Sequence, residues 1–283
     1  MRRIAAPIGL SLILSLFLFA TAKPKDAVVH GMGAIAPSAD QIKSFPKAPK
    51  DTRRGALPTH ADSSAYMPPV GDQGGAGSCV AWSTGYALRA FYLSKVNKLD
   101  VSKPENVPSP AYIFNHGASI EHSSAPCTDR GMQISTALEI LRAGVVSLAE
   151  MPYDDKICGP APDIEMQSRA KEFRIDGWAY VDPDSFDIIK GALADGNAVV
   201  FGIRIAKTFN EFKGNGVYSR SPKDTLMGGH AMVLVGYDDE RKAFRLQNSW
   251  GKDWADQGRA WLSYDTFSSD ATDAYIVRAS EGR

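Results

Sequence analysis

Two periodicities of hydrophobic residues divide the chain. In the first half, apolar residues recur every three or four positions, as on one face of a helix, whereas the second half holds short β-branched runs typical of strands. A helical portion followed by a strand-rich portion predicts an α+β fold with two lobes. The expected helices begin at Cys79 and at Pro110 and cover 132–143, 164–173 and 184–194, and the expected strands cover 199–205, 230–237, 244–246, 260–264 and 274–277.

Residues at the helix ends support this assignment. Ser78 stands directly before the helix at Cys79, where its hydroxyl is expected to cap the first turn. Ser109 followed by Pro110 is typical of an N-cap and a first helical position. Gly144 is expected to end the amphipathic helix that precedes it.

The first 22 residues have the parts of an export signal. Arg2 and Arg3 give a positive start, an apolar run follows over 8–19, and Ala20-Thr21-Ala22 matches a cleavage site. The apolar run is shorter than the roughly 20 residues that cross a bilayer. We therefore expect an exported protein, periplasmic or secreted, without stable membrane insertion after cleavage; an uncleaved anchor is the alternative.

Residues 23–55 differ from the rest of the chain. They hold four prolines among scattered basic residues and few large apolar ones, so they cannot bury much surface. We expect a linker or a short pro-segment, and Arg53-Arg54 is a candidate processing site. The remaining residues, 56–283, then form the main domain, with a helical lobe over about 56–160 and a strand-rich lobe over about 161–283.

The composition and the balanced charge of the chain argue against a nucleic-acid-binding protein but do not indicate a specific function. Hydrophobic residues make up 44% of the chain, which is enough for a substantial core. Lys and Arg number 32 and Asp and Glu also number 32, so no excess of positive charge favours nucleic acid. We therefore expect no nucleic-acid partner, and the oligomeric state is left open.

Cys79 is the candidate reactive residue. A glycine-rich loop over 71–77 leads into it, and the helix that it begins offers free backbone N–H groups and a positive dipole end. Both favour the thiolate, which is the nucleophilic form of cysteine. The alternative is a buried structural cysteine, which is the commoner fate of a lone one.

The chain has three cysteines, so in an exported protein at least one of them has no disulfide partner within the chain. We favour a disulfide between Cys127 and Cys158, which flank an amphipathic helix and would leave Cys79 free; the pairs 79–127 and 79–158 are the alternatives. His116, His122 and Cys127 lie close in sequence, but their spacing matches no standard zinc pattern. We expect no metal and no cofactor.

A nucleophilic cysteine requires a base and a group that orients it. His230 lies at the start of an expected strand, and Asn248 and Trp250 follow at the end of another. Each has an ordinary structural explanation, as a hydrogen-bonded strand residue, a turn former and a core residue respectively. Together with the glycine loop before Cys79, they favour a catalytic site.

Four motifs in order make the chain resemble the papain-like cysteine peptidases: Gln73, the GSC that ends at Cys79, GGHAMVLVGY around His230, and QNSWGKDW around Asn248. His230 lies 151 residues after Cys79, near the spacing typical of that family. The resemblance covers about 57–264 and implies a helical lobe and a β-barrel-like lobe with a peptide cleft between them.

The resemblance also implies a role for each matching residue. Cys79 would be the nucleophile and His230 its ion-pair partner, with Asn248 orienting the imidazole. Gln73 and the backbone N–H of Cys79 would form the oxyanion hole. Trp250 would shield the His–Asn contact, and Cys127–Cys158 resembles a bridge of the family's helical lobe.

The resemblance implies a peptide or protein substrate, bound by Gly131, Met132 and Gly229. Met132 stands where the family usually has a second glycine, which leaves the form of the neighbouring binding pocket open. Residues 23–55 are much shorter than the family's usual pro-domain; they are either a linker or a segment across the cleft. Two alternative functions use the same fold: a catalytically inactive peptide- or protein-binding module, and an acyl transferase or cell-wall peptide hydrolase.

Overall fold

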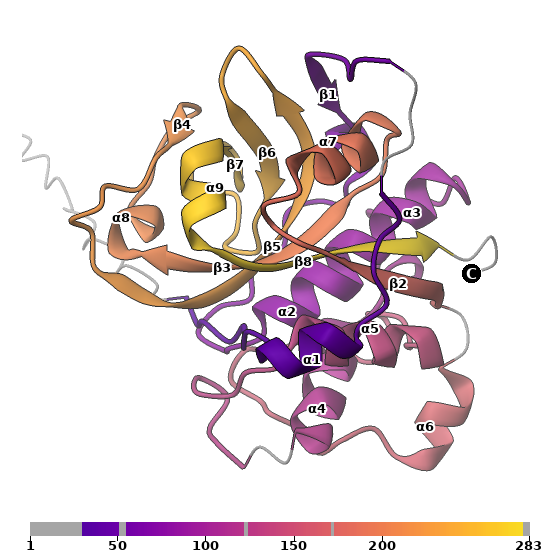
Figure 1. The fold of residues 1–283 in the computed structure, drawn as a ribbon. Helices are drawn as coiled ribbons and strands as arrows, with labels where there is room; N and C mark the ends of the chain where they lie inside the picture. Colours follow the sequence, from indigo (N-terminus) through magenta and orange to yellow (C-terminus); the bar gives the residue numbers. More distant parts are fainter. Residues whose placement is uncertain (1–29, 51–54, 122–123, 171–172, 280–283) are drawn as a thin grey trace, which may run out of the picture.

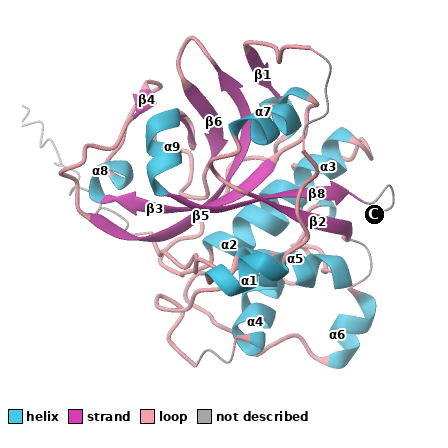
Figure 2. Ribbon diagram, in the orientation of Figure 1, coloured by secondary structure: helices cyan, strands magenta, loops and turns pink. Residues whose placement is uncertain are grey.

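The computed structural model describes residues 30–50, 55–121, 124–170 and 173–279. The expected export signal, Arg53-Arg54 and His122 lie outside these residues. Helices gather at one end of the molecule and a curved sheet forms the other, so the expected two-lobed α+β architecture is confirmed (Figures 1 and 2). No helix among the described residues is long and apolar enough to span a bilayer.

The helical lobe is built around one long helix that begins at Cys79. Its central stretch has π-helical hydrogen bonding, and Gly85 in that stretch lets Ile113 of a neighbouring helix pack directly on the backbone. The helical elements of this lobe are η1 (Ser64–Tyr66), α2 (Cys79–Ala81), η2 (Trp82–Arg89), α3 (Ala90–Lys95), η3 (Pro104–Asn106), α4 (Pro110–Ile120), α5 (Ile134–Ala143) and α6 (Ile164–Arg169).

Most of the expected helix ends are confirmed, and one cap is wrong. The Ser109 hydroxyl accepts a hydrogen bond from the Tyr112 backbone, and Gly144 ends α5 with a φ of 122°. Ser78 stands before the first helical residue but makes no cap hydrogen bond. Its hydroxyl instead lies 2.6 Å from the hydroxyl of Tyr153, which gives the fully buried Ser78 a polar partner.

The second lobe is one sheet with the order β2-β8-β3-β5-β6-β7-β4, in which β1 pairs with β5. All pairs are antiparallel except β4 with β7. The strands are β1 (His60–Asp62), β2 (Ile175–Val181), β3 (Val199–Ala206), β4 (Val217–Tyr218), β5 (Leu226–Asp238), β6 (Ala243–Gln247), β7 (Arg259–Ser263) and β8 (Ala271–Ala279), and the helices around them are α7 (Phe186–Ala194), α8 (Lys207–Asn210) and α9 (Tyr264–Asp270).

Alternation along β5 places its two faces in two different cores. Ala231 and Val233 belong to the core shared with the helical lobe. Met232 and Leu234 belong to the core beneath the opposite face of the sheet. His230 shares the face of Met232 and packs on Trp250 of the second core, one residue before Ala231 of the shared core, so β5 holds it beside the boundary between the two lobes.

The disulfide between Cys127 and Cys158 forms, with 5.6 Å between the two Cα atoms, and Cys79 is the free thiol. The bridge closes a loop that contains α5. It therefore fixes the stretch before α5, including Met132, to the body of the helical lobe.

The described part of the expected linker is folded against both lobes. α1 (Ala39–Ser44) begins with a capping box made by Ser38 and Gln41. Gln41 contacts Gln133 at the start of α5, and Lys47 pairs with Tyr180 of β2. In Figure 1 α1 accordingly lies at the junction between the helices and the sheet.

Candidate active site

The chain before α1 runs through the cleft between the lobes. We call His30–Ile35 the cleft segment. Its Ala34 N–H donates to the Gly229 carbonyl of β5 at 3.2 Å. Across the cleft, the Met132 N–H donates to the Gly33 carbonyl at 2.8 Å, and the Ile35 N–H donates to the Met132 carbonyl at 3.1 Å. The segment thus makes backbone hydrogen bonds to both walls of the cleft.

Glycines allow the cleft segment to approach this closely. A Cβ on Gly33 would lie 1.9 Å from the Gly77 carbonyl oxygen and 2.8 Å from that of Arg130. A Cβ on Gly131 would lie 2.6 Å from the Gly33 oxygen, and one on Gly229 would lie 2.1 Å from the Ala34 oxygen. All of these neighbours are backbone atoms, so a side chain at any of the three glycines is incompatible with the bound segment.

The thiol of Cys79 is completely buried at the start of α2. Its sulfur adjoins the backbone of Gly33 in the cleft segment and of Ala231, the residue after His230. Burial raises the pKa of Cys79, although nearby backbone groups lower it. In this closed arrangement, burial therefore opposes the thiolate that the helix start favours.

His230 is held by one hydrogen bond and one ring. Its Nε2 lies 2.8 Å from Oδ1 of Asn248, and the ring of Trp250 covers it at a centroid distance of 4.6 Å. Nδ1 is buried and has no hydrogen-bond partner among the described residues. Asn248 and Trp250 therefore both contact the imidazole, and they leave its Nδ1 unbonded among the described residues.

Burial makes His230 sensitive to acid. It lowers the pKa of His230 from 6.5 to about 4, and the neighbouring His30 lowers it further while the Asn248 hydrogen bond raises it. The unfolded imidazole binds a proton below pH 6.5, so stability falls from pH 6.5 towards pH 4. We expect this residue to contribute a loss on the order of 3 kcal/mol.

Urea unfolding of the wild type and of His230→Gln at both pH values measures this loss. The wild type should lose more stability than the variant between pH 6.5 and 4. Equal losses in the two proteins would contradict a buried neutral imidazole.

Gln73 joins the two lobes and contacts the cleft segment. Its Nε2 donates to the Gly31 carbonyl at 2.9 Å and to the Ala76 carbonyl at 3.0 Å, while its Oε1 accepts from the Ser249 hydroxyl at 2.7 Å. The side-chain amide is therefore a fixed donor that points at a carbonyl of the bound segment, as an oxyanion-hole donor must. Tyr153 also donates to the Gln73 carbonyl at 2.7 Å.

Ser249, Tyr153 and His30 contribute to the site although sequence reasoning gave them no role. The His30 ring stacks on Trp250 at 5.1 Å, and its Nε2 lies 3.3 Å from the Asp72 carboxylate. The QNSWG motif contains Ser249 and could have indicated it. His30 carries no sequence signal, because its contacts join segments that are far apart in the chain.

The backbone of Met132, rather than its side chain, faces the cleft. Its side chain is buried beneath Gly117, where an added Cβ would lie 2.4 Å from the Met132 Cε. The Met132 side chain therefore packs into the helical lobe and not into the cleft. Gly131, Met132 and Gly229 all lie along the cleft segment.

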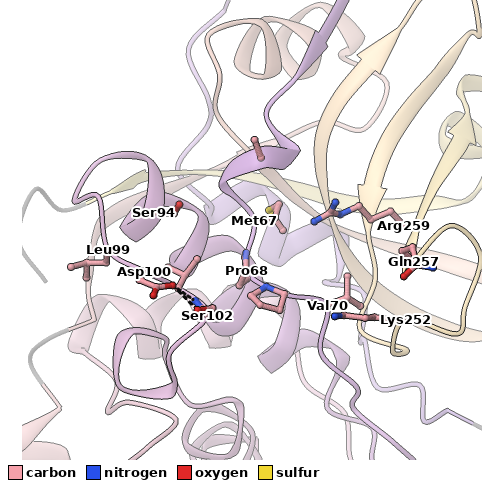
Figure 3. Close-up of a pocket in the computed structure, with 13 residues that line it drawn as sticks. Met67, Pro68, Val70, Ser94, Leu99, Asp100, Ser102, Lys252, Gln257 and Arg259 are labelled. Atoms are coloured by element: carbon pink, nitrogen blue, oxygen red, sulfur yellow. Dashed lines mark hydrogen bonds between the residues drawn. The ribbon is translucent and has the colours of Figure 1, made fainter.

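A hollow of about 560 Å³ lies between the lobes away from these residues (Figure 3). Met67, Pro68 and Asp100 line one side, and Lys252 and Arg259 line the other. It contains none of the predicted catalytic residues. The described residues also include no cluster of three His, Cys, Asp or Glu side chains suited to a metal ion.

The geometry agrees with comparisons to known proteins. Residues 57–275 match the profile of the papain family cysteine proteases, which is most of the chain. The chain belongs to this family. Mouse cathepsin K is 26% identical over 74% of the chain and 60% of its own length, and an uncharacterized peptidase C1-like protein of Acanthamoeba polyphaga mimivirus is 28% identical over 73% and 68%.

Solved structures of the papain family share the fold. Xylellain, a cysteine protease from Xylella fastidiosa, superposes with a TM-score of 0.75 at 29% identity, over 92% of this chain and 99% of that one. Digestive procathepsin L2 proteinase from Tenebrio molitor superposes with a TM-score of 0.70 at 20% identity, over 88% and 78%. The chain thus spans nearly all of the bacterial protease and about three fifths of cathepsin K.

Proposed function

We propose that the chain is an exported thiol peptidase whose centre is Cys79, His230, Asn248 and Gln73. The hydrogen bond from His230 to Asn248 beneath Trp250 carries this proposal, because it leaves Nδ1 for the buried free thiol on the adjacent helix. The cysteine protease family and its peptide-cleaving members support the reaction class.

The reaction follows from these groups. His230 takes the thiol proton, and the Cys79 sulfur adds to the carbonyl carbon of a peptide bond. Gln73 and the Cys79 backbone N–H stabilise the oxyanion. When the C–N bond breaks, His230 gives its proton to the leaving amine. Water then hydrolyses the thioester with His230 as the base, which restores the thiol.

We propose further that residues 23–55 are an inhibitory pro-segment. The cleft segment occupies the Gln73 donor and the Met132 backbone, which a substrate would need. Its bridge between Ala34 and Met132 is parallel. Displacement of the segment would free both walls and expose the thiol. Residues 1–22 and the disulfide support export, since disulfides persist outside the reducing cytosol.

Hydrolysis of fluorogenic peptides by the full chain tests this function. We expect Gln73→Ala to lower kcat by about 10²-fold with little change in KM, because its amide acts on the oxyanion. Unchanged hydrolysis in Gln73→Ala would contradict the assigned role. Absence of any hydrolysis by Gly33→Ala, the variant expected to displace the cleft segment, with peptide still bound, would favour the inactive binding module instead.

A further inference from the structure

Tyr153 lies between α5 and α6 and is a polar residue that the proposed reaction does not use. Its hydroxyl donates to the backbone carbonyl of Gln73 at 2.7 Å. The same hydroxyl lies 2.6 Å from that of Ser78. A phenol has one proton and a carbonyl only accepts, so the Ser78 hydroxyl is the donor in the second bond. One oxygen atom of Tyr153 thus holds both ends of the loop 73–78.

The two ends of this loop carry the two proposed oxyanion donors. Gln73 supplies its side-chain amide. Ser78 supplies the carbonyl half of the peptide group whose N–H belongs to Cys79. Because a peptide group is planar, a rotation at Ser78 would turn that N–H as well. By binding both residues, Tyr153 therefore fixes the two donors relative to each other.

Gln73 is held on its other side by the sheet lobe. Its backbone N–H donates to the Ser249 carbonyl at 2.9 Å, and its Oε1 accepts from the Ser249 hydroxyl at 2.7 Å. Ser249 thus holds the N–H and the side chain of Gln73, and Tyr153 holds its carbonyl. The amide is oriented from both lobes, and the Tyr153 hydroxyl is a contribution of the helical lobe.

The segment around Tyr153 is anchored before and after this residue. The Met151 carbonyl accepts from the hydroxyl of Ser109, the N-cap of α4, at 2.6 Å. Asp155 Oδ2 accepts from the Gly75 N–H at 2.9 Å. The segment therefore contacts the middle of the loop 73–78 as well as its two ends.

The disulfide joins the same segment to the last part of the loop. The Gly77 N–H donates to the Cys127 carbonyl at 2.9 Å, and Cys127 is bridged to Cys158, which follows Tyr153 in the same segment. The loop before Cys79 is thus bound along its length to one disulfide-linked wall of the helical lobe.

The surroundings keep the Tyr153 ring in place and its hydroxyl protonated. The Trp82 ring meets it edge-on at a centroid distance of 5.0 Å. Burial raises the pKa of Tyr153, although the hydrogen bond with Ser78 lowers it. The phenol therefore keeps its proton near neutral pH, as donation to the Gln73 carbonyl requires.

We propose that Tyr153 is a positioning residue of the oxyanion hole, whose single hydroxyl sets the directions of the Gln73 amide and of the Cys79 backbone N–H together. This inference rests on the proposed peptidase function, to whose site it adds a residue. Tyr153 acts through Gln73 and Ser78 and not on the reacting atoms. Loss of its hydroxyl should weaken binding of the transition state and leave binding of the substrate intact.

Kinetics of Tyr153→Phe test this role, measured on the full chain with Gly33→Ala to displace the cleft segment. The substitution removes the hydroxyl and keeps the ring. We expect kcat to fall about tenfold while KM stays within about twofold, because only the developing oxyanion uses the positioned donors. An unchanged kcat, or a loss carried entirely by KM, would overturn the role.

A matched control and a double variant separate positioning from general stability. Tyr86→Phe removes a hydroxyl that donates to the Pro69 carbonyl at 2.9 Å, from a ring that also packs on Trp82, and it should leave kcat unchanged. Added to Gln73→Ala, Tyr153→Phe should lower kcat by less than about threefold, because the amide that it positions is already gone. The same loss in both backgrounds would show that Tyr153 acts independently of Gln73, against the proposal.

A second measurement does not depend on hydrolysis. A peptide aldehyde adds to the Cys79 thiol: the S–C bond forms, the C=O π pair moves to oxygen, and the thiol proton passes to His230. Tyr153→Phe should weaken binding of the aldehyde at least about fivefold and leave binding of the matching peptide alcohol, which forms no such bond, unchanged. If no peptide is cleaved but this difference is found, the peptidase function fails and the positioning role stands. Equal aldehyde affinity with and without the hydroxyl would overturn the role.

Discussion

Replacing Cys79 with Ala is expected to abolish peptide hydrolysis, with a loss in kcat/KM of at least about 10⁴-fold. The sulfur forms the bond to substrate in the proposed reaction, and no other described cysteine is free to replace it. The residual rate should come only from binding and the oxyanion donors. Fluorogenic peptide hydrolysis with purified wild type and variant measures the loss.

Two controls accompany this substitution. The thermal midpoint of Cys79→Ala should stay close to that of the wild type, because an alanine fits the space of the buried thiol. Disruption of the disulfide by Cys158→Ser should lower stability but leave activity measurable below the midpoint. Substantial hydrolysis by Cys79→Ala would show that Cys79 is not the nucleophile.

Replacing Gly33 with Ala is expected to activate the full chain at least tenfold. The added methyl would lie 1.9 Å from the Gly77 carbonyl oxygen, and contacts below 3.0 Å force one partner to move. Since Gly77 belongs to the loop that precedes Cys79, the cleft segment is the partner that can leave. Initial rates of peptide hydrolysis, measured without any prior processing, test this expectation.

Gly216→Ala is the matched control, because an added Cβ there meets no atom within 4 Å. It should leave the initial rate at the wild-type value. If Gly33→Ala is as slow as the wild type while it remains folded, the cleft segment does not limit access to the site.

The long amphipathic elements followed directly from the sequence. The expected strand at 230–237 lies inside β5, and the helix at 132–143 is present as α5 with its end at Gly144. The periodicity of hydrophobic residues did not predict the extent or the presence of several short or polar elements. The helix expected over 164–173 ends at Arg169, and β2 and α9 were not expected. Their formation depends on pairing and packing with distant parts of the chain, which local pattern does not contain.

The catalytic residues could be proposed from motifs, but their protonation could not. Helix position favours a thiolate at Cys79, yet burial raises its pKa in the closed structure. The burial comes partly from the cleft segment, which approaches the thiol through the backbone of Gly33 and binds mainly through backbone hydrogen bonds. Backbone hydrogen bonding leaves little trace in a sequence. The composition of residues 23–55 therefore could not distinguish a linker from a pro-segment that lies in the cleft.

The pH dependence of Cys79 alkylation in Gly33→Ala tests the central claim most directly. With the cleft segment displaced, the helix start and His230 should hold the thiol as an anion, so alkylation by iodoacetamide should already be half-maximal below about pH 7. The wild type should react slowly across the same range. If Cys79 in Gly33→Ala reacts only above about pH 8.5, as an ordinary thiol does, the thiol and imidazole do not form a catalytic pair.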